Sequence, residues 1–293
     1  MRQDGTVIPT CSLNDVLPAT RNHRSMEWPC HYIIAQLHEA QRSHLFTMAG
    51  MLRFEMKAQV FFELLSNAQP LDIFSAYDVC LIPALAEGLG FGRDRAFFRA
   101  AGLYLIGAAK AIPDPLGRAP KPSPLDNSRL QMLRTLVERW RTTGAWETFR
   151  QALLATFPKS TRLTPSRDDA SVPSPNQATS VPRGQLARLR QLRSIFYGLG
   201  TARTDILICN IVLPFAAAVA QQENHPALGE YARNLYNTYP GLSSNQITRA
   251  MCKQLLLKSE PKGACQQQGL HFIYTQTCRE KRCHECLITR QEV

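Results

Sequence analysis

The sequence is short of acidic residues and has no long, uninterrupted apolar run. Asp and Glu number 23 against 34 Lys and Arg, which gives a formal net charge of +11. This charge favours acidic partners such as nucleic acid, although a basic balance also serves simply to keep a protein soluble. The longest apolar run, 206–220, is interrupted by Asn210 and Pro214 and is shorter than the roughly 20 residues of a membrane-spanning helix. We therefore predict a buried, kinked helix there and no membrane partner.

A secretory leader pattern is also lacking. Residues 1–28 mix Arg, Asp, Asn and Pro without an apolar core segment. We therefore expect a polar N-terminal tail over 1–28 and a soluble protein in the cytoplasm. Nine cysteines are many for a reducing compartment, where clustered thiols are more often metal ligands or redox groups than disulfides.

No alternating strand pattern is evident, whereas apolar residues recur at helical spacing along most of the chain. The longest such series is Leu45, Met48, Ala49, Leu52, Met56, Val60 and Leu64. The pattern predicts a mainly α, multi-helical fold with a C-terminal cysteine-bearing tail packed on the helices. Further helices are expected at 72–89, 93–112, 144–156, 185–197, 227–239 and 245–257, and one from about Asp126 or Asn127 to Trp140.

The composition changes between 158 and 184, where Pro, Ser, Thr, Asn and Asp replace almost all large apolar residues. Such a segment cannot offset the entropy lost on ordering, so we predict a flexible linker at 158–184. The linker would separate a helical region at 29–157 from a C-terminal helical region at 185–293 that holds the cysteine cluster. The two regions could still pack together as one body.

Familiar catalytic motifs are incomplete. His38 and Glu39 begin like a zinc-protease helix motif, but Arg42 stands where the second histidine belongs. Three glycines within 88–92 follow a helical stretch rather than a strand, and no Lys-Ser or Lys-Thr pair completes a phosphate loop. The sequence shows neither converging carboxylates nor a nucleophile beside a base. We expect no catalytic residue in this chain.

Three cysteines near the C-terminus have the spacing of metal ligands. Cys283 and Cys286 form a C-x2-C pair, in which two intervening residues let both sulfurs reach one ion, and Cys278 lies five residues upstream. A closed zinc site or a 4Fe-4S cluster normally takes four ligands, and Cys265 is the nearest further cysteine. Spacing does not separate zinc from a 4Fe-4S cluster, and three unrelated thiols at a polar terminus is the remaining interpretation. Alternative fourth ligands are Cys209, Cys252 and His284.

Basic residues accompany both the cysteines and the helix after the predicted linker. At the cysteines they would contact phosphates or offset thiolate charge, and on the helix they would form a nucleic-acid face or a solvated surface. The candidate nucleic-acid-binding residues are Arg183, Arg190, Arg193, Arg279, Lys281 and Arg282.

Several motifs together resemble the bacterial family called domain of unknown function 2851, over roughly 29–287. They are Pro29-Cys30-His31, Ala49-Gly50, Arg53-Phe54, Lys57-Ala58, Glu87-Gly88-Leu89-Gly90-Phe91 with Arg93, Arg95 and Phe97, Asn210, Pro214-Phe215, Asn245-x-Ile247-Thr248-Arg249, Gln267-Gln268-Gly269-Leu270, Tyr274 and the three cysteines.

The resemblance implies a member that lacks the region with acidic and histidine-bearing strand motifs, similar to a metal-dependent nuclease core, that precedes this part in the family. A separate chain would then supply that region. Three hypotheses follow: a non-catalytic, metal- or cluster-containing module that binds DNA or RNA, a component of a split metal-dependent nuclease, and a structural or protein-interaction scaffold.

Overall fold

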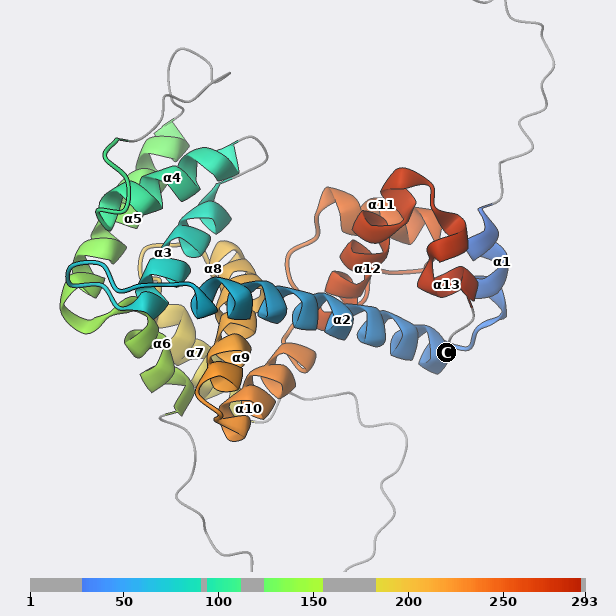
Figure 1. The fold of residues 1–293 in the computed structure, drawn as a ribbon. Helices are drawn as coiled ribbons and strands as arrows, with labels where there is room; N and C mark the ends of the chain where they lie inside the picture. The colour runs from blue at the N-terminus through green and yellow to red at the C-terminus, as the bar shows by residue number, and fades with distance from the viewer. Residues whose placement is uncertain (1–27, 91–93, 112–123, 155–182, 291–293) are drawn as a thin grey trace, which may run out of the picture.

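The chain is helical throughout the part that the computed structural model describes, which comprises residues 28–90, 94–111, 124–154 and 183–290 (Figure 1). In these ranges the only β-type pairings are two isolated bridges, Leu71 with Phe74 and Pro240 with Gly263. The predicted mainly α, multi-helical class is therefore confirmed. In order, the helices are α1 (Pro29–Gln36), α2 (Glu39–Ser66), α3 (Ala76–Leu89), α4 (Arg95–Leu105), α5 (Pro124–Thr143), α6 (Ala145–Leu154), α7 (Arg183–Ile195), α8 (Thr201–Leu207), the π-helix η3 (Ile208–Val212), α9 (Leu213–Gln222), α10 (Pro226–Asn237), α11 (Gln246–Gln254), α12 (Ala264–Gln276), the 3-10 turns η4 (Cys278–Glu280) and η5 (Cys283–Glu285), and α13 (Leu287–Arg290).

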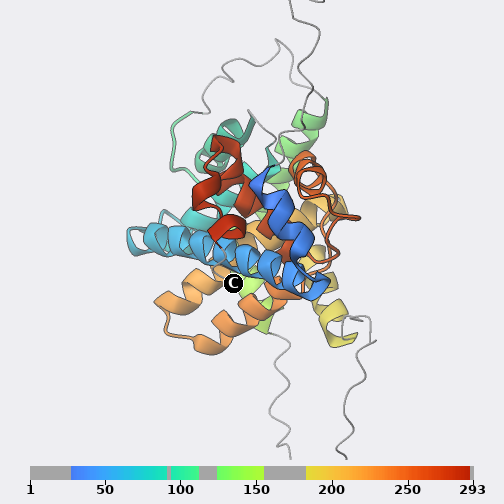
Figure 2. The same ribbon diagram turned by 90° about the vertical axis from the view of Figure 1, so that its right-hand side faces the viewer.

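The 28-residue helix α2 connects two groups of helices. Its N-cap is His38, whose backbone N–H donates to the Gln41 side chain at 2.9 Å. This bond satisfies one of the free backbone donors at the start of the helix. Figures 1 and 2 show α3 to α10 around one end of α2, and α1 with α11 to α13 around the other. Helix α2 therefore contributes side chains to the packing of both groups.

Two glycines let α2 and α12 cross at close range. A Cβ atom added to Gly50 would lie 2.1 Å from the carbonyl oxygen of Cys265, and one added to Gly269 would lie 2.0 Å from the carbonyl oxygen of Phe46. No side chain fits at either position, because backbone atoms already occupy the space. The hydroxyl of Tyr236 on α10 donates to the Gly50 carbonyl at 3.2 Å, which ties a third helix to the crossing.

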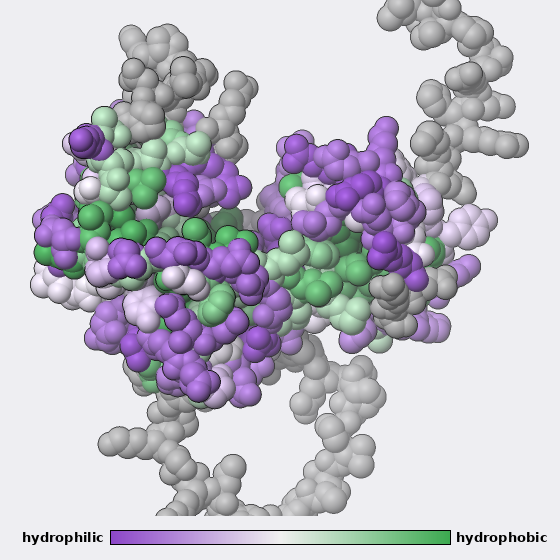
Figure 3. All heavy atoms as spheres, in the orientation of Figure 1, coloured by the Kyte–Doolittle hydropathy of each residue, from purple (hydrophilic) through white to green (hydrophobic). Residues whose placement is uncertain are grey.

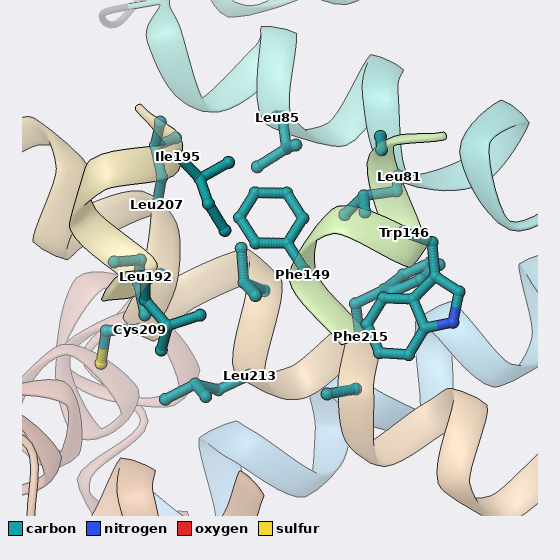
Figure 4. Close-up of a cluster of buried hydrophobic side chains, with 14 of the residues drawn as sticks. Leu81, Leu85, Trp146, Phe149, Leu192, Ile195, Leu207, Cys209, Leu213 and Phe215 are labelled. Atoms are coloured by element: carbon teal, nitrogen blue, oxygen red, sulfur yellow. The ribbon is translucent and has the colours of Figure 1, made fainter. Parts of the chain in front are cut away.

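The larger hydrophobic core joins helices from both sides of the segment 155–182. Trp146 of α6 packs against Phe215 of α9, with ring centroids 5.3 Å apart (Figure 4). Phe149 of α6 packs against Phe196, which follows α7, at the same centroid distance of 5.3 Å. The two helical regions therefore share one core. The linker predicted at 158–184 lies outside the described residues except for its last two positions, which begin α7.

The apolar run 206–220 lies in a continuous helical stretch, Thr201–Gln222, that is interrupted by the π-helical turn η3. Among the described residues this is the one stretch long and apolar enough to cross a membrane, and 78% of its apolar window is buried inside the fold. It is a core helix of this fold. The prediction of a buried helix is confirmed, and its regular α geometry is broken by the π-turn.

Several predicted boundaries differ from the observed ones. Helix α3 begins at Ala76 rather than at 72, because Asp72 adopts a left-handed conformation (φ 50°) in the turn closed by the Leu71–Phe74 bridge. Helix α4 ends at Leu105, two residues before Gly107, whose φ of 82° terminates the helix. The predicted ends at 93 and 112 lie outside the described residues.

The apolar series along α2 is only partly buried. Leu45 and Ala49 are in the core, and the inward face continues through Phe54, Ala58 and Phe61. Met48 is half-buried, and the last four members of the predicted series form an exposed apolar stripe, with exposed fractions of 40–55%: Leu52, Met56, Val60 and Leu64. Both faces of α2 carry apolar residues, so helical spacing alone did not identify the buried face.

Candidate metal centre

The chain after α12 folds into two tight turns that bring the tail cysteines together. Cys278 begins the first 3-10 turn, which ends at Lys281 in a left-handed conformation (φ 55°). The Arg282 N–H then reaches back to the Thr277 carbonyl at 2.9 Å, and the Cys286 N–H donates to the Cys283 carbonyl at 3.1 Å. This backbone reversal returns Cys286 to Cys278.

The thiols of Cys278 and Cys286 form a hydrogen-bonded pair. Hydrogen bonding from Cys278 lowers the pKa of Cys286, because it stabilises the thiolate, and the same bond together with burial raises the pKa of Cys278. The hydroxyl group of Thr277 also lowers the pKa of Cys286. Of the two sulfurs, Cys286 is thus the one set up to be a thiolate, the form that binds metal.

Cys30 on α1 lies beside this pair, although it is remote in sequence. The amide Nε2 of Gln254, at the end of α11, is 3.7 Å from the Cys278 sulfur and 3.9 Å from the Cys30 sulfur. Burial raises the pKa of Cys30, hydrogen bonding from Gln254 lowers it, and the neighbouring Cys286 and Cys283 raise it again. A fourth cysteine therefore belongs to the group.

Cys283 lies near the other thiols, and its charge would raise the pKa of Cys30. Its side chain is partly exposed, and its backbone carbonyl accepts a short hydrogen bond from the Thr289 hydroxyl group. The adjacent His284 is exposed and its Nε2 lies 3.3 Å from Glu285 Oε1, so it faces solvent rather than the sulfurs. Nothing places His284 among the ligands.

The structure does not bring Cys265 to the cluster. Its sulfur donates to the Thr47 carbonyl at 3.5 Å, and it is buried at the crossing of α2 and α12. It belongs to the larger core, whereas Cys30 and Cys286 belong to a second hydrophobic cluster with Leu45, Met251 and Ile288. Cys209 lies in the larger core as well. Cys252 is in the second cluster, but no contact links its sulfur to Cys278 or Cys286 in the described part of the chain.

Thiols are suitable metal ligands, but the positions of these four sulfurs are not those of a formed metal site. Four thiols are the ligands of a structural zinc ion or a 4Fe-4S cluster. Within the described ranges, however, no three His, Cys, Asp or Glu side chains stand where they could hold one metal ion. All the described cysteines are free thiols.

The predicted nucleic-acid-binding residues fall into two groups. Arg193 forms a bidentate pair with Asp205, at 2.7 and 2.9 Å, and Asp205 also accepts the Tyr239 hydroxyl group at 2.8 Å. Arg193 therefore links α7 to α8, and the carboxylate of Asp205 already neutralises its charge. Arg190 is exposed on α7, and Arg183 begins that helix at the edge of the described residues.

The tail basic residues are exposed but partly paired. Arg282 contacts Glu285 at 2.7 Å and donates to the Gln276 carbonyl at 2.6 Å. These two contacts stabilise the turn in the C-terminal tail. Arg279 approaches Glu280 at 3.7 Å, and Lys281 is exposed. These residues do not form one continuous basic surface with α7, which lies at the other end of α2 (Figures 1 and 2).

Sequence reasoning did not identify Cys30 and Gln254 as parts of the site. No local spacing relates Cys30 to the tail, and the only signal for it was the Pro29-Cys30-His31 motif. No family model, curated protein or solved structure matches the chain. The resemblance to domain of unknown function 2851 therefore stays a prediction.

Proposed function

We propose that this chain is a non-catalytic helical module that binds nucleic acid, and that Cys278, Cys283 and Cys286 hold zinc or a 4Fe-4S cluster. The observation that supports the metal is the meeting of Cys30 with the tail pair across Gln254. Cys30 takes the place that the sequence had suggested for Cys265. When bound, the metal or cluster would act as a cross-link between α1, α11 and the tail.

Elemental analysis separates the two cofactors. Protein purified without oxygen is assayed for zinc and iron, and its visible spectrum is recorded. One zinc per chain, or iron with the absorption of a cluster, would support the proposal. Protein that contains neither, even after zinc or iron and sulfide are supplied to the reduced protein, would remove the metal from it.

The excess of basic residues supports the nucleic-acid part of the proposal. A net charge of +11 creates a field that attracts polyanions, and phosphate contacts release counterions. Labelled single- and double-stranded DNA and RNA are titrated with the protein across a series of salt concentrations. We expect affinity that falls as salt rises. No affinity at low salt would overturn this function.

Partners and location follow from the same proposal. Reduced cysteines suit the cytoplasm, and we propose that location. The family resemblance suggests a separate chain with the nuclease-like region, and the exposed α2 stripe (Leu52, Met56, Val60 and Leu64) is a surface that favours the alternative of a protein-interaction scaffold. Metal content without any nucleic-acid affinity would favour the scaffold. Cleavage of nucleic acid in magnesium or manganese, after adding such a partner, would favour the split nuclease.

A further inference from the structure

Two basic side chains of α2 point into the region where three helices meet. Arg53 and Lys57 are one turn apart and therefore share a face of α2. Arg53 Nε donates to the Gln268 side-chain oxygen on α12 at 3.0 Å. Lys57 Nζ donates to the backbone carbonyl of Asn210 at 3.3 Å and, by a short hydrogen bond, to its side-chain oxygen.

The π-helical turn explains why Asn210 is available to Lys57. Pro214 has no N–H, so the Asn210 carbonyl lacks the donor that an α-helix would supply four residues later. The chain widens into η3 at this point, where the Leu213 N–H donates to the Ile208 carbonyl instead. Single π-turns within helices are frequent at functional sites. Here the turn directs two oxygens of Asn210 at one lysine.

Arg53 and Lys57 have no acidic ion-pair partner among the residues that the structure describes. Burial lowers the pKa of Lys57 well below its usual value, and the neighbouring charges of Arg53 and Arg95 lower it further. Burial likewise lowers the pKa of Arg53. In the described part of the chain no carboxylate forms an ion pair with either residue. Glu87 is already paired with Arg95 at 2.8 Å and with Arg99 at 3.3 Å.

Unused donors face the same region. Among the described residues, Arg53 makes one side-chain hydrogen bond, through Nε, which leaves both terminal guanidinium nitrogens available. His271 lies one turn after Gln268 on α12, and its Nε2 is buried without a partner. Burial lowers the pKa of His271 to about 4, and the charges of Arg53 and Lys57 contribute to the shift. The histidine is therefore neutral at pH 7.

The region is accessible although it is enclosed. Arg53, Lys57, Asn210 and His271 all retain part of their solvent exposure. Figure 3 shows the surface drawn inwards between the two groups of helices that α2 connects.

We propose that Arg53 and Lys57, with His271, bind a phosphate group of a nucleotide or nucleic acid. The guanidinium fork and the ammonium would give charge-assisted hydrogen bonds to two phosphate oxygens, and the anion would supply the missing negative charge. Phosphate binding stands on this geometry alone. Its assignment to nucleic acid rests on the function proposed above.

Calorimetric titrations at low ionic strength test the site with three probes: inorganic phosphate, a nucleoside monophosphate and a single-stranded oligonucleotide. Lys57→Met and Arg53→Gln should each weaken phosphate binding about tenfold, the usual effect of losing one charge-assisted contact. Lys258→Met is the matched control, because it removes an exposed lysine that follows α11 and makes no contact with Arg53 or Lys57 among the described residues, so it should leave the affinity unchanged.

Each pattern of results has a distinct meaning. Wild-type protein that binds none of the probes, or binds phosphate as tightly after both substitutions, overturns the site. Phosphate binding that both substitutions weaken, without oligonucleotide binding, keeps the site and removes nucleic acid as its ligand. Salt-dependent oligonucleotide binding that neither substitution changes keeps the proposed function and removes the site.

Thermal melting shows whether Lys57 has a structural role instead. Without phosphate, Lys57→Met should fold but melt somewhat below the wild-type temperature, because the two Asn210 oxygens lose their donor. Phosphate should raise the melting temperature of the wild type and not that of Lys57→Met. A variant that unfolds, together with a wild type indifferent to phosphate, would assign Lys57 to structure and refute the proposal.

Discussion

Gly50 and Gly269 face each other where α2 crosses α12, and a Cβ atom on Gly269 would come within 3.1 Å of the Gly50 nitrogen and 2.0 Å of the Phe46 carbonyl oxygen. Gly269→Ala must therefore push the two helices apart. We expect a loss in the free energy of unfolding of about 1–3 kcal/mol or more, the usual cost of overpacking. Urea denaturation followed by circular dichroism measures it.

A helical glycine in open surroundings provides the control for this prediction. A Cβ atom on Gly229 of α10 would meet only the Ala220 side chain, at an ordinary 3.4 Å. Gly229→Ala should be neutral or stabilise by about 0.5–1 kcal/mol, since alanine favours the helix. Equal effects of the two substitutions would show that the close crossing is not the cause.

The tail cysteines should couple metal content to stability. Cys286→Ser and Cys283→Ser are each expected to lower the bound zinc or iron and the melting temperature, because metal binding is linked to folding. Metal is quantified in protein purified without oxygen, and melting is followed by circular dichroism. If both variants retain the wild-type metal content, the tail is not a metal site.

Substitution of Cys30 and substitution of Cys265 should have opposite effects on metal content, which tests which of the two is the fourth ligand. Cys30 lies beside the tail thiols across Gln254, whereas the Cys265 sulfur contacts the Thr47 carbonyl. Cys30→Ser should therefore lower the metal content, and Cys265→Ser should leave it unchanged even if the core is weakened. The same metal assay decides between them, and loss of metal only in Cys265→Ser would reverse our assignment.

Local sequence patterns predicted the helices and the proximity of the tail cysteines, because both depend on short-range geometry. Helical spacing and caps act within a few residues, and the two tight turns between Cys278 and Cys286 are closed by nearby backbone hydrogen bonds. The buried break in the helix at Asn210 and Pro214 was predictable for the same reason.

Long-range relationships could not be predicted in this way. Cys30 joins the tail only because α1 packs against α13, and Lys57 meets Asn210 only because α2 crosses the π-turn. The sequence did not indicate which face of α2 is buried, since apolar residues lie on both sides of that helix. Tertiary packing, rather than periodicity, selects which face is buried.

Asp205 should be among the most important polar residues for stability. It accepts hydrogen bonds from Arg193 on α7 and Tyr239 after α10 while almost fully buried. Asp205→Asn removes the negative charge and leaves Arg193 without its partner, so we expect a loss of about 1–3 kcal/mol in the free energy of unfolding. Chemical denaturation measures the loss, and a wild-type midpoint would contradict this role.

His271 should make the protein less stable in mild acid. Burial and the charges of Arg53 and Lys57 hold its folded pKa at about 4, below the 6.5 of an ordinary histidine. Between these values the unfolded chain binds a proton that the folded chain does not, so stability falls as the pH drops from about 6.5 towards 4 and is unaffected above that window. His271→Phe should reduce this fall. Urea denaturation of both proteins at pH 7.5 and pH 5, in buffers without phosphate, isolates the effect, because packing changes appear equally at the two pH values. A variant that loses as much stability in acid as the wild type would exclude His271 as the source.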